Sequence, residues 1–472
     1  ILASPPDGYS FLPGGSNNNL FSRKTFTNSL KIDITSHINS INQLKIGANY
    51  REYTLDYSDI NLQPPDSLIS IDPIYESPFL HDPQEMPDSS IHTSRYNFTP
   101  YEFSAYVQNK MELSDLIINA GIRIDYFDPK GRILNDPADP SIYNPIKPEN
   151  RFHDINNDGI QNNLEQDVTV NEREAYWYRE TKPKTAISPR LGVSFPFSDK
   201  GAIHFSYGHF FQIPRFELLY YNSDFDLGQG TGNIGIIGNA DLKPERTASY
   251  EIGIQQILNK HISMDATIYM RDIRNLTGTR SEEIIIFGGA SAYNKYVNSD
   301  FAFVRGLVLS FRSHPIKGLS GTLDYTFQIA RGTASDPAQA RNSLAGGALP
   351  EVHLIPLDWD QTHTLNASLN YSIGRKGISF ISQVRSGLSY TPESTEDIST
   401  LIQNSEKKPF YWNVDMKAYY KAQVYDRNID FYIRILNIFD HLNHIDIYAD
   451  TGVADRTKYL QQGRDQDTNE YY

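Results

Sequence analysis

The 472-residue chain contains no cysteine, only five methionines and three tryptophans. The absence of cysteine excludes a cysteine nucleophile, an iron–sulfur cluster and a cysteine-based zinc site. It also suits an exported protein, in which no thiol needs protection from oxidation. Apolar runs of about 18 or more residues are missing as well, so no helix of this chain is expected to span a bilayer.

Positive charge is in deficit. Lysine and arginine number 43 against 57 aspartates and glutamates, which gives a net charge of −14. An acidic chain of this kind argues against nucleic acid as a partner. What the chain has instead is 31 tyrosines, 24 phenylalanines, 30 glycines and 26 prolines. This composition favours strands and turns, and it argues against disorder.

Apolar and polar residues alternate along many segments, with a period of two rather than 3.6. Ile262–Arg271 and Tyr101–Leu113 are clear examples, and His363–Ile373, Leu319–Ile329, Trp412–Lys421 and Leu30–Ile38 behave alike. These segments often reach ten residues, whereas strands of globular proteins usually have about 5–6. Their polar faces are charged over the whole length, which suits a wide, water-filled lumen.

The connections between these segments alternate in length. Short turns are expected at Asn39–Asn42, Ser114–Asp115, Asp199–Gly201, Asn259–His261, Pro315–Gly318, Arg375–Gly377 and Tyr425–Arg427. Long connections are expected at Asp59–Asn97, Pro129–Pro183, Pro214–Glu245, Asn275–Asp300, Gly332–Asp360 and Pro392–Lys408. Short turns on one rim and long loops on the other are typical of outer-membrane barrels.

The sequence therefore predicts an all-β fold, a transmembrane antiparallel up-and-down β-barrel with short periplasmic turns and long extracellular loops. About fourteen strands in seven hairpins are expected, because a closed sheet pairs every backbone amide within lipid. The alternative is a soluble β protein such as a propeller, although no regular repeat of about 40–50 residues is present.

The alternation also predicts which side chains face lipid and which face the lumen. The lipid-facing set is Leu30, Ile32, Ile34, Ile262, Met264, Ile268, Leu365, Leu369, Phe431 and Ile433. The lumen-facing set is Lys31, Asp33, Asp265, Arg271, Asn366, Asn370, Asp430 and Arg434. Aromatic residues near strand ends, including Tyr50, Tyr53, Tyr126 and Phe127, are expected to form girdles at the membrane interfaces.

Several motifs occur in the order known from one family. They are Gly121–Phe127 (GIRIDYF), Ser188–Gly192 (SPRLG), Phe205–Gly208 (FSYG), Phe211–Tyr220 (FQIPRFELLY), Gly238–Arg246 (GNADLKPER), Ser249–Gly253 (SYEIG) and Ile435–Asp440 (ILNIFD). Together they resemble the barrel of TonB-dependent outer-membrane receptors, in a style similar to those of Bacteroidetes-like bacteria. The resemblance implies part of a barrel of twenty-two strands.

The resemblance also implies a function and partners. Residues 1–472 are expected to be the barrel segment of such a receptor, with the plug domain and the last strand not present. Substrate uptake is then energised by TonB, within the TonB–ExbB–ExbD complex, acting on the plug. Outer-membrane lipid and lipopolysaccharide, a small nutrient ligand and a surface lipoprotein are the other expected partners. The alternatives are a passive porin or an adhesin-like barrel, and no enzymatic activity is expected.

The longest loop contains a spacing typical of calcium-binding loops. The segment Asp154–Glu165 follows D-x-[DN]-x-[DN]-G-x5-E, with a glycine at the sharp turn. The candidate metal ligands are Asp154, Asn156, Asp158, Ile160 through its carbonyl, Asn162 and Glu165. Calcium bound there would hold together a long loop, and the alternative is an ordinary solvated turn.

A second candidate site lies just after one of the expected strands. It is rich in aromatic and acidic residues: Phe216, Tyr220, Tyr221, Asp224 and Asp226. Aromatic faces beside carboxylates suit sugars, peptides or cationic ligands. The alternative is that these aromatic residues serve only in packing and in the girdle.

Overall fold

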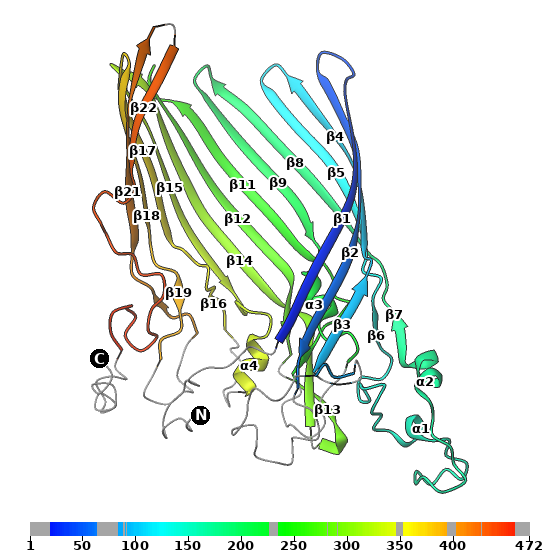
Figure 1. The fold of residues 1–472 in the computed structure, drawn as a ribbon. Coiled ribbons are helices and arrows are strands. Elements are labelled where there is room, and N and C mark those ends of the chain that lie inside the picture. The colour runs from blue at the N-terminus through cyan, green and yellow to red at the C-terminus, as the bar shows by residue number, and fades with distance from the viewer. Residues whose placement is uncertain are drawn as a thin grey trace, which may run out of the picture.

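The computed structural model describes residues 19–63, 84–87, 90, 92–225, 235–280, 282–289, 291–345, 353–393, 403–425 and 427–457. One sheet of eighteen strands dominates it and curves around a central space (Figure 1); its pairings are antiparallel except where Ile236 and Ile237 run parallel to Asn294 and Lys295. Fourteen of these strands are long and follow one another as a meander, each paired with the next along the chain. The predicted number of strands and their up-and-down order are confirmed.

The long strands of the meander are β1 (Asn19–His37), β2 (Asn42–Asn61), β4 (Tyr101–Leu113), β5 (Leu116–Asp128), β8 (Lys184–Ser198), β9 (Gly201–Gln212), β11 (Glu245–Ile257), β12 (Ile262–Thr279), β14 (Ser291–Ile316), β15 (Leu319–Gly332), β17 (His363–Ile373), β18 (Lys376–Arg385), β21 (Tyr411–Val424) and β22 (Arg427–Ile435). The short strands are β3 (Thr93–Phe98), β6 (Arg132–Leu134), β7 (Tyr178–Glu180), β10 (Ile236–Ile237), β13 (Ile284–Ile286), β16 (Ile355–Pro356), β19 (Ser389–Tyr390) and β20 (Glu406–Lys407). The helices are α1 (Pro148–Arg151), α2 (Val170–Trp177), α3 (Phe216–Tyr220), α4 (Gln339–Ala345) and the 3-10 turn η3 (Phe287–Gly289).

The register of the strands sorts the two predicted sets of side chains onto opposite faces. Ile32 is opposite Ala48, and the same apolar row continues through Ala105 and Ile124 to Ile187. The ten residues predicted to face lipid all fall on this face, and the eight predicted lumen residues fall on the other. We call the first face outer and the second face inner. Helix α3 lies against the inner face, inside the curved sheet (Figure 1).

Short turns close the hairpins at one end, and their sequences explain why. The side-chain oxygen of Asn39 accepts hydrogen bonds from the backbone N–H groups of Ile41 (2.9 Å) and Asn42 (2.8 Å). Asn259 repeats this arrangement with the N–H groups of His261 and Ile262. An asparagine that satisfies the turn amides in this way fixes a tight reversal without a long loop.

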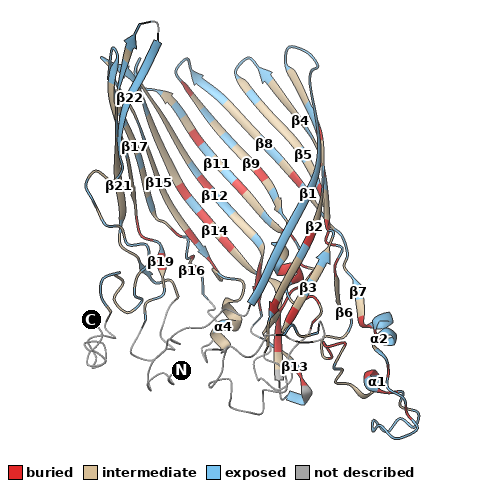
Figure 2. Cartoon of the chain, viewed as in Figure 1, coloured by how far each residue is buried: buried red, intermediate tan, exposed pale blue. Residues whose placement is uncertain are grey.

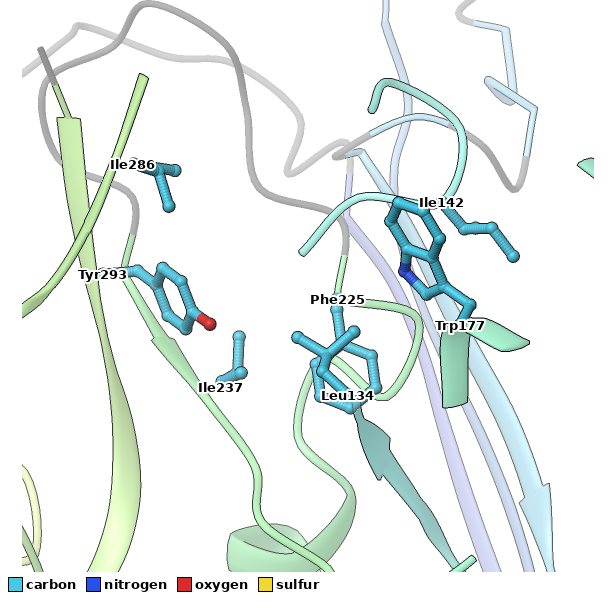
Figure 3. Packing of buried hydrophobic residues seen from close by; sticks show 7 residues of the cluster. All are labelled: Leu134, Ile142, Trp177, Phe225, Ile237, Ile286 and Tyr293. Atoms are coloured by element: carbon cyan, nitrogen blue, oxygen red, sulfur yellow. The ribbon is translucent and has the colours of Figure 1, made fainter. Parts of the chain in front are cut away.

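Long loops gather at the other end, where most of the buried side chains lie (Figure 2). One cluster there joins loops from distant parts of the chain and consists of Leu134, Ile142, Trp177, Phe225, Ile237, Ile286 and Tyr293 (Figure 3). A second cluster packs α3 against the inner wall and consists of Leu55, Phe127, Leu218, Leu219, Tyr220, Ala240 and Leu242. Apolar burial at this rim therefore organises the loops over the mouth of the sheet.

The sheet has two open edges. In the described part of the chain β1 pairs only with β2, and β22 pairs only with β21. The predicted twenty-two strands and the separate plug domain stay predictions. Among the described residues, no helix combines the length and the apolar character needed to cross a bilayer.

Candidate functional site

Helix α3 places the predicted aromatic patch at the mouth of the lumen. Pro214 precedes the helix, and Leu218, Leu219 and Tyr220 turn its apolar side toward the inner wall, where all three are buried. The N–H of Asn239 donates to the carbonyl of Leu218 (3.0 Å), which ties the helix to the loop that returns toward β11. Glu217 and the adjoining Tyr221 remain exposed.

Tyr220 belongs to the packing of this site. Its side chain is 1% exposed, and its ring stacks on Phe98 with centroids 4.4 Å apart. The hydroxyl donates a hydrogen bond to the carbonyl of Pro129. Burial raises the pKa of the Tyr220 hydroxyl well above its usual value, so the group stays neutral. The structure therefore gives Tyr220 a packing role, which was one of the two alternatives that the sequence left open.

The other members of the patch are distributed differently. Phe216 packs edge-on against Tyr53 with ring centroids 5.0 Å apart, while Tyr221 is 50% exposed. Asp224 accepts a hydrogen bond from Arg132 at 2.8 Å and forms an ion pair with it. Asp226 lies outside the described residues. The structure therefore brings Phe216 and Tyr220 together in one cluster and leaves Tyr221 at the surface.

Further polar and aromatic side chains line the inner wall beside α3. Glu217 forms an ion pair with Arg23 of β1. On the neighbouring strands, Tyr57 stacks on Tyr96 with centroids 4.7 Å apart and donates to Asp59 at 3.2 Å. The strand alternation carried the signal for these residues, because it places Arg23 and Tyr57 on the face of Asp33.

The prediction that Tyr53 and Phe127 belong to an interfacial girdle is wrong. Phe127 is fully buried in the cluster beneath α3, and Tyr53 packs on Phe216 and donates to Glu102 at 2.7 Å. Residues three positions apart on a strand point to opposite faces, so Tyr50 and Tyr53 cannot share a girdle. Tyr50 does lie on the outer face, opposite Phe103.

The predicted calcium loop, residues 154–165, forms a compact turn held by its own side chains. The carboxylate of Asp154 accepts from the N–H groups of Asp158 (3.2 Å) and Gly159 (2.8 Å). Glu165 is buried and accepts from the N–H groups of Ile155 (2.9 Å) and Asn162 (3.0 Å). Gly159 adopts a φ of 72°, which is the left-handed conformation that the sharp turn requires.

Short helices flank this loop on both sides. Helix α1 precedes it, and α2 follows it with a capping box in which Thr169 and Glu172 exchange side-chain and backbone hydrogen bonds. Phe152 and Asp167 form a β-bridge that closes the base of the loop. Within the described residues, no three acidic or histidine side chains converge as a metal site. The calcium site stays a prediction.

The fold and the distribution of side chains together define a class of protein. A single curved antiparallel sheet has an apolar outer face, a polar inner face, short turns at one rim and packed loops at the other. This is the architecture of a barrel that crosses a membrane with strands.

The sequence matches the family described as "TonB dependent receptor-like, beta-barrel" over residues 3–438. The chain therefore belongs to the TonB-dependent receptor family, a family of outer-membrane transporters and receptors rather than enzymes, and its place is the outer membrane. The resemblance seen in the sequence motifs is confirmed. A comparison with curated proteins found no match.

Solved structures of the same fold include three outer-membrane proteins. The FrpB iron transporter from Neisseria meningitidis shares 15% identity at a TM-score of 0.54, with 89% of this chain and 51% of that chain covered. The outer membrane transporter YddB from Escherichia coli shares 11% at 0.57, with 90% and 52% covered. A ferric enterobactin receptor from Pseudomonas aeruginosa, solved with enterobactin, shares 15% at 0.55, with 89% and 49% covered. The chain thus spans about half the length of these structures.

Proposed function

We propose that the chain is the barrel part of an active-transport receptor. In this proposal TonB, with ExbB and ExbD, acts on a plug domain, and a small nutrient ligand passes through the lumen. The observation that carries the proposal is the mouth of the sheet, where α3 and its loop fold inward and leave Glu217 and Tyr221 exposed beside a polar inner wall. Membership of the family supports the same mechanism.

Energy dependence of uptake tests this proposal. Cells that express the complete protein should accumulate the nutrient only while the proton gradient and TonB are intact, because a plugged lumen admits nothing by diffusion. A protonophore or deletion of tonB should abolish the uptake. Uptake that persists in both conditions, together with swelling of proteoliposomes in osmotically matched sugars, would instead identify a passive porin.

We propose that the exposed side of α3 contributes to ligand binding. Tyr221 offers an exposed aromatic face at the mouth, Phe216 packs on Tyr53 of the inner wall, and the Asp224–Arg132 pair lies on the following turn. Asp226 is included from the sequence alone. Tyr220 supports this surface from beneath rather than touching the ligand. A surface lipoprotein that closes over these loops is part of the same proposal.

We also propose that the loop 154–165 binds calcium and holds the long connection between β5 and β8 in place. The left-handed turn at Gly159 and the inward carboxylates of Asp154 and Glu165 support this proposal. Binding would exchange the backbone hydrogen bonds of these carboxylates for ion contacts at about 2.3–2.6 Å. Calcium would also neutralise the repulsion among Asp154, Asp158 and Glu165.

Calcium removal should therefore loosen this loop without weakening the barrel. We expect a chelator to make residues 154–165 sensitive to protease, and Asp158→Ala to have the same effect in the presence of calcium. The melting temperature of the sheet should stay unchanged, because the loop lies outside the strand ladder. Limited proteolysis with calcium and with chelator tests whether the loop binds calcium. Identical cleavage in both conditions would show that the loop is an ordinary solvated turn.

A further inference from the structure

A polar cavity of about 470 Å³ lies at the loop rim, where the ends of β12 and β15 meet β14 and helix α4. Helix α4 is at the loop end of these strands (Figure 1). The described lining residues carry hydroxyl, amide or charged side chains, apart from Ala334 and Ala340. The volume is in the range of small-molecule sites, about 300–1,000 Å³, but the walls lack large apolar groups. Such a cavity favours a small hydrophilic ligand, held by hydrogen bonds and charge.

Asp300 supplies the most enclosed charge of this cavity. Its side chain is half-buried, whereas Arg280 and Glu282 are exposed. The backbone N–H of Phe301 donates to Oγ1 of Thr333 (3.2 Å), so the Thr333 hydroxyl donates in turn to Oδ1 of Asp300 (3.0 Å).

The neighbouring strand leaves room for this carboxylate. Gly278 of β12 lies beside it, and a side chain there would overlap the Asp300 carboxylate and the hydroxyl of Ser299. The Ser299 hydroxyl also forms a hydrogen bond with Asp300. Glycine at position 278 and two hydroxyl donors therefore hold the carboxylate at the cavity.

The Asp300 carboxylate has no cationic partner among the described residues, since its hydrogen bonds come from hydroxyl groups. An ionised carboxylate can accept about four hydrogen bonds, so two hydroxyl donors leave part of this capacity unused. A charge that is removed from water is costly unless an opposite charge compensates for it. An ammonium group of a ligand would provide that compensation.

Arg280 and helix α4 complete the cavity. The guanidinium of Arg280 can bind a carboxylate through two parallel hydrogen bonds. The backbone N–H of Arg341 donates to Oγ1 of Thr279 (3.1 Å), which holds α4 against the end of β12. Gln339 and Ser343 of α4 form part of the wall. One cavity therefore combines a cation, two carboxylates with Glu282, and neutral hydrogen-bonding groups.

We propose that this cavity binds a small zwitterion of the amino-acid type. The ammonium group of the ligand lies on Asp300, its carboxylate pairs with Arg280, and Gln339 and Ser343 hydrogen-bond to the rest of the molecule. The second carboxylate, Glu282, makes the ammonium the stronger of the two determinants. This binding goes beyond the proposed transport and does not rest on it, because purified protein binds the ligand without TonB.

Four related probes separate the two charges. Serine carries both, serinamide only the ammonium, N-acetylserine only the carboxylate, and N-acetylserinamide neither. In calorimetric titrations of the complete purified protein in detergent, serine should bind at least about tenfold more tightly than N-acetylserine, because a charge-assisted hydrogen bond to Asp300 is lost. Serine should exceed serinamide by only about twofold to fivefold, because Arg280 is exposed.

Two single variants assign the charges to residues. Asp300→Asn should remove the advantage of the ammonium, so that serine and N-acetylserine bind equally. Arg280→Gln should remove the advantage of the carboxylate, so that serine and serinamide bind equally, and the preference for the ammonium should persist. Asp358→Asn is the matched control, because it removes an exposed acid that does not line the cavity, and it should leave all four affinities unchanged.

Resistance of the folded band to SDS before heating shows that each variant retains its barrel. Equal affinities of the wild type for the four probes would overturn the proposal, as would a preference for serine that survives Asp300→Asn. Glucose is the neutral competitor, rich in hydroxyl groups. Binding of glucose as tight as that of serine would identify a site for polyols and would also overturn the proposal.

Discussion

Replacing Ile268 by arginine should lower the free energy of unfolding of the barrel by about 2–4 kcal/mol. Ile268 lies on the outer face, opposite Ile252 and Leu307, and its side chain is 60% exposed. It lies in the middle part of β12, which runs from Ile262 at the turn end to Thr279 at the loop end. A guanidinium at that depth loses its hydration to hydrocarbon, with no partner to replace it. Unfolding by denaturant in lipid vesicles measures the change.

The matched control is Asp265→Arg on the same strand. Asp265 faces the lumen, opposite Gln255 and Ser310, where water solvates a new charge. The free energy of unfolding should change by less than about 1 kcal/mol, since a solvated site gains or loses little from one charge. Equal losses for the two variants would contradict the assignment of the faces. A large loss at Asp265 alone would reverse it.

The sequence was sufficient for the strands because a barrel strand obeys one local rule. Each position on β12 faces either lipid or water, so Ile262, Met264 and Ile268 separate from Asp265 and Arg271 without knowledge of the neighbouring strands. The tight turns are equally local, as the hydrogen bonds of Asn39 and Asn259 show. Length and alternation therefore determined the sheet.

Packing at the loop rim could not be predicted in the same way. Tyr220 is buried because Phe98 and Pro129, about a hundred residues earlier in the chain, close over it. The alternation of apolar and polar residues within one strand or helix cannot predict a contact between such distant parts of the chain. The girdle prediction for Tyr53 and Phe127 was wrong for another reason. Both residues lie on the inner face, and the alternation of β2 and β5, applied residue by residue, predicts that position.

The start of α2, the helix that follows the predicted calcium loop, could have been predicted from the sequence. Thr169 and Glu172 are spaced as a capping box, a signal that is visible in the sequence and marks the start of α2. A helix of only eight residues gives little apolar periodicity, so the capping box is the stronger local signal for it. The compact turn at Gly159 agrees with the spacing, while the ion itself remains a proposal.

Replacing Tyr220 by alanine should release α3 from the inner wall. The ring is 1% exposed and stacked on Phe98, and truncation of a buried aromatic residue costs about 3–5 kcal/mol. The substitution should lower the free energy of local unfolding of α3 rather than that of the whole barrel, because α3 is joined to the sheet by packing and not by the strand ladder. Hydrogen exchange at the amides of Gly238 and Asn239, which bond to the carbonyls of Tyr221 and Leu218, should accelerate by about two orders of magnitude or more.

Two neighbouring variants define what this result means. Tyr220→Phe keeps the stack and removes only the hydrogen bond to Pro129, so it should cost about 1–3 kcal/mol. Tyr221→Ala changes a half-exposed side chain and should leave the exchange of Gly238 and Asn239 within about 0.5 kcal/mol of the wild type, while it weakens uptake if the aromatic face contacts ligand. Amides within β4 should be unaffected in all three variants. Unchanged exchange in Tyr220→Ala would show that α3 is held by Leu218 and Leu219 alone, and the packing role assigned to Tyr220 would be wrong.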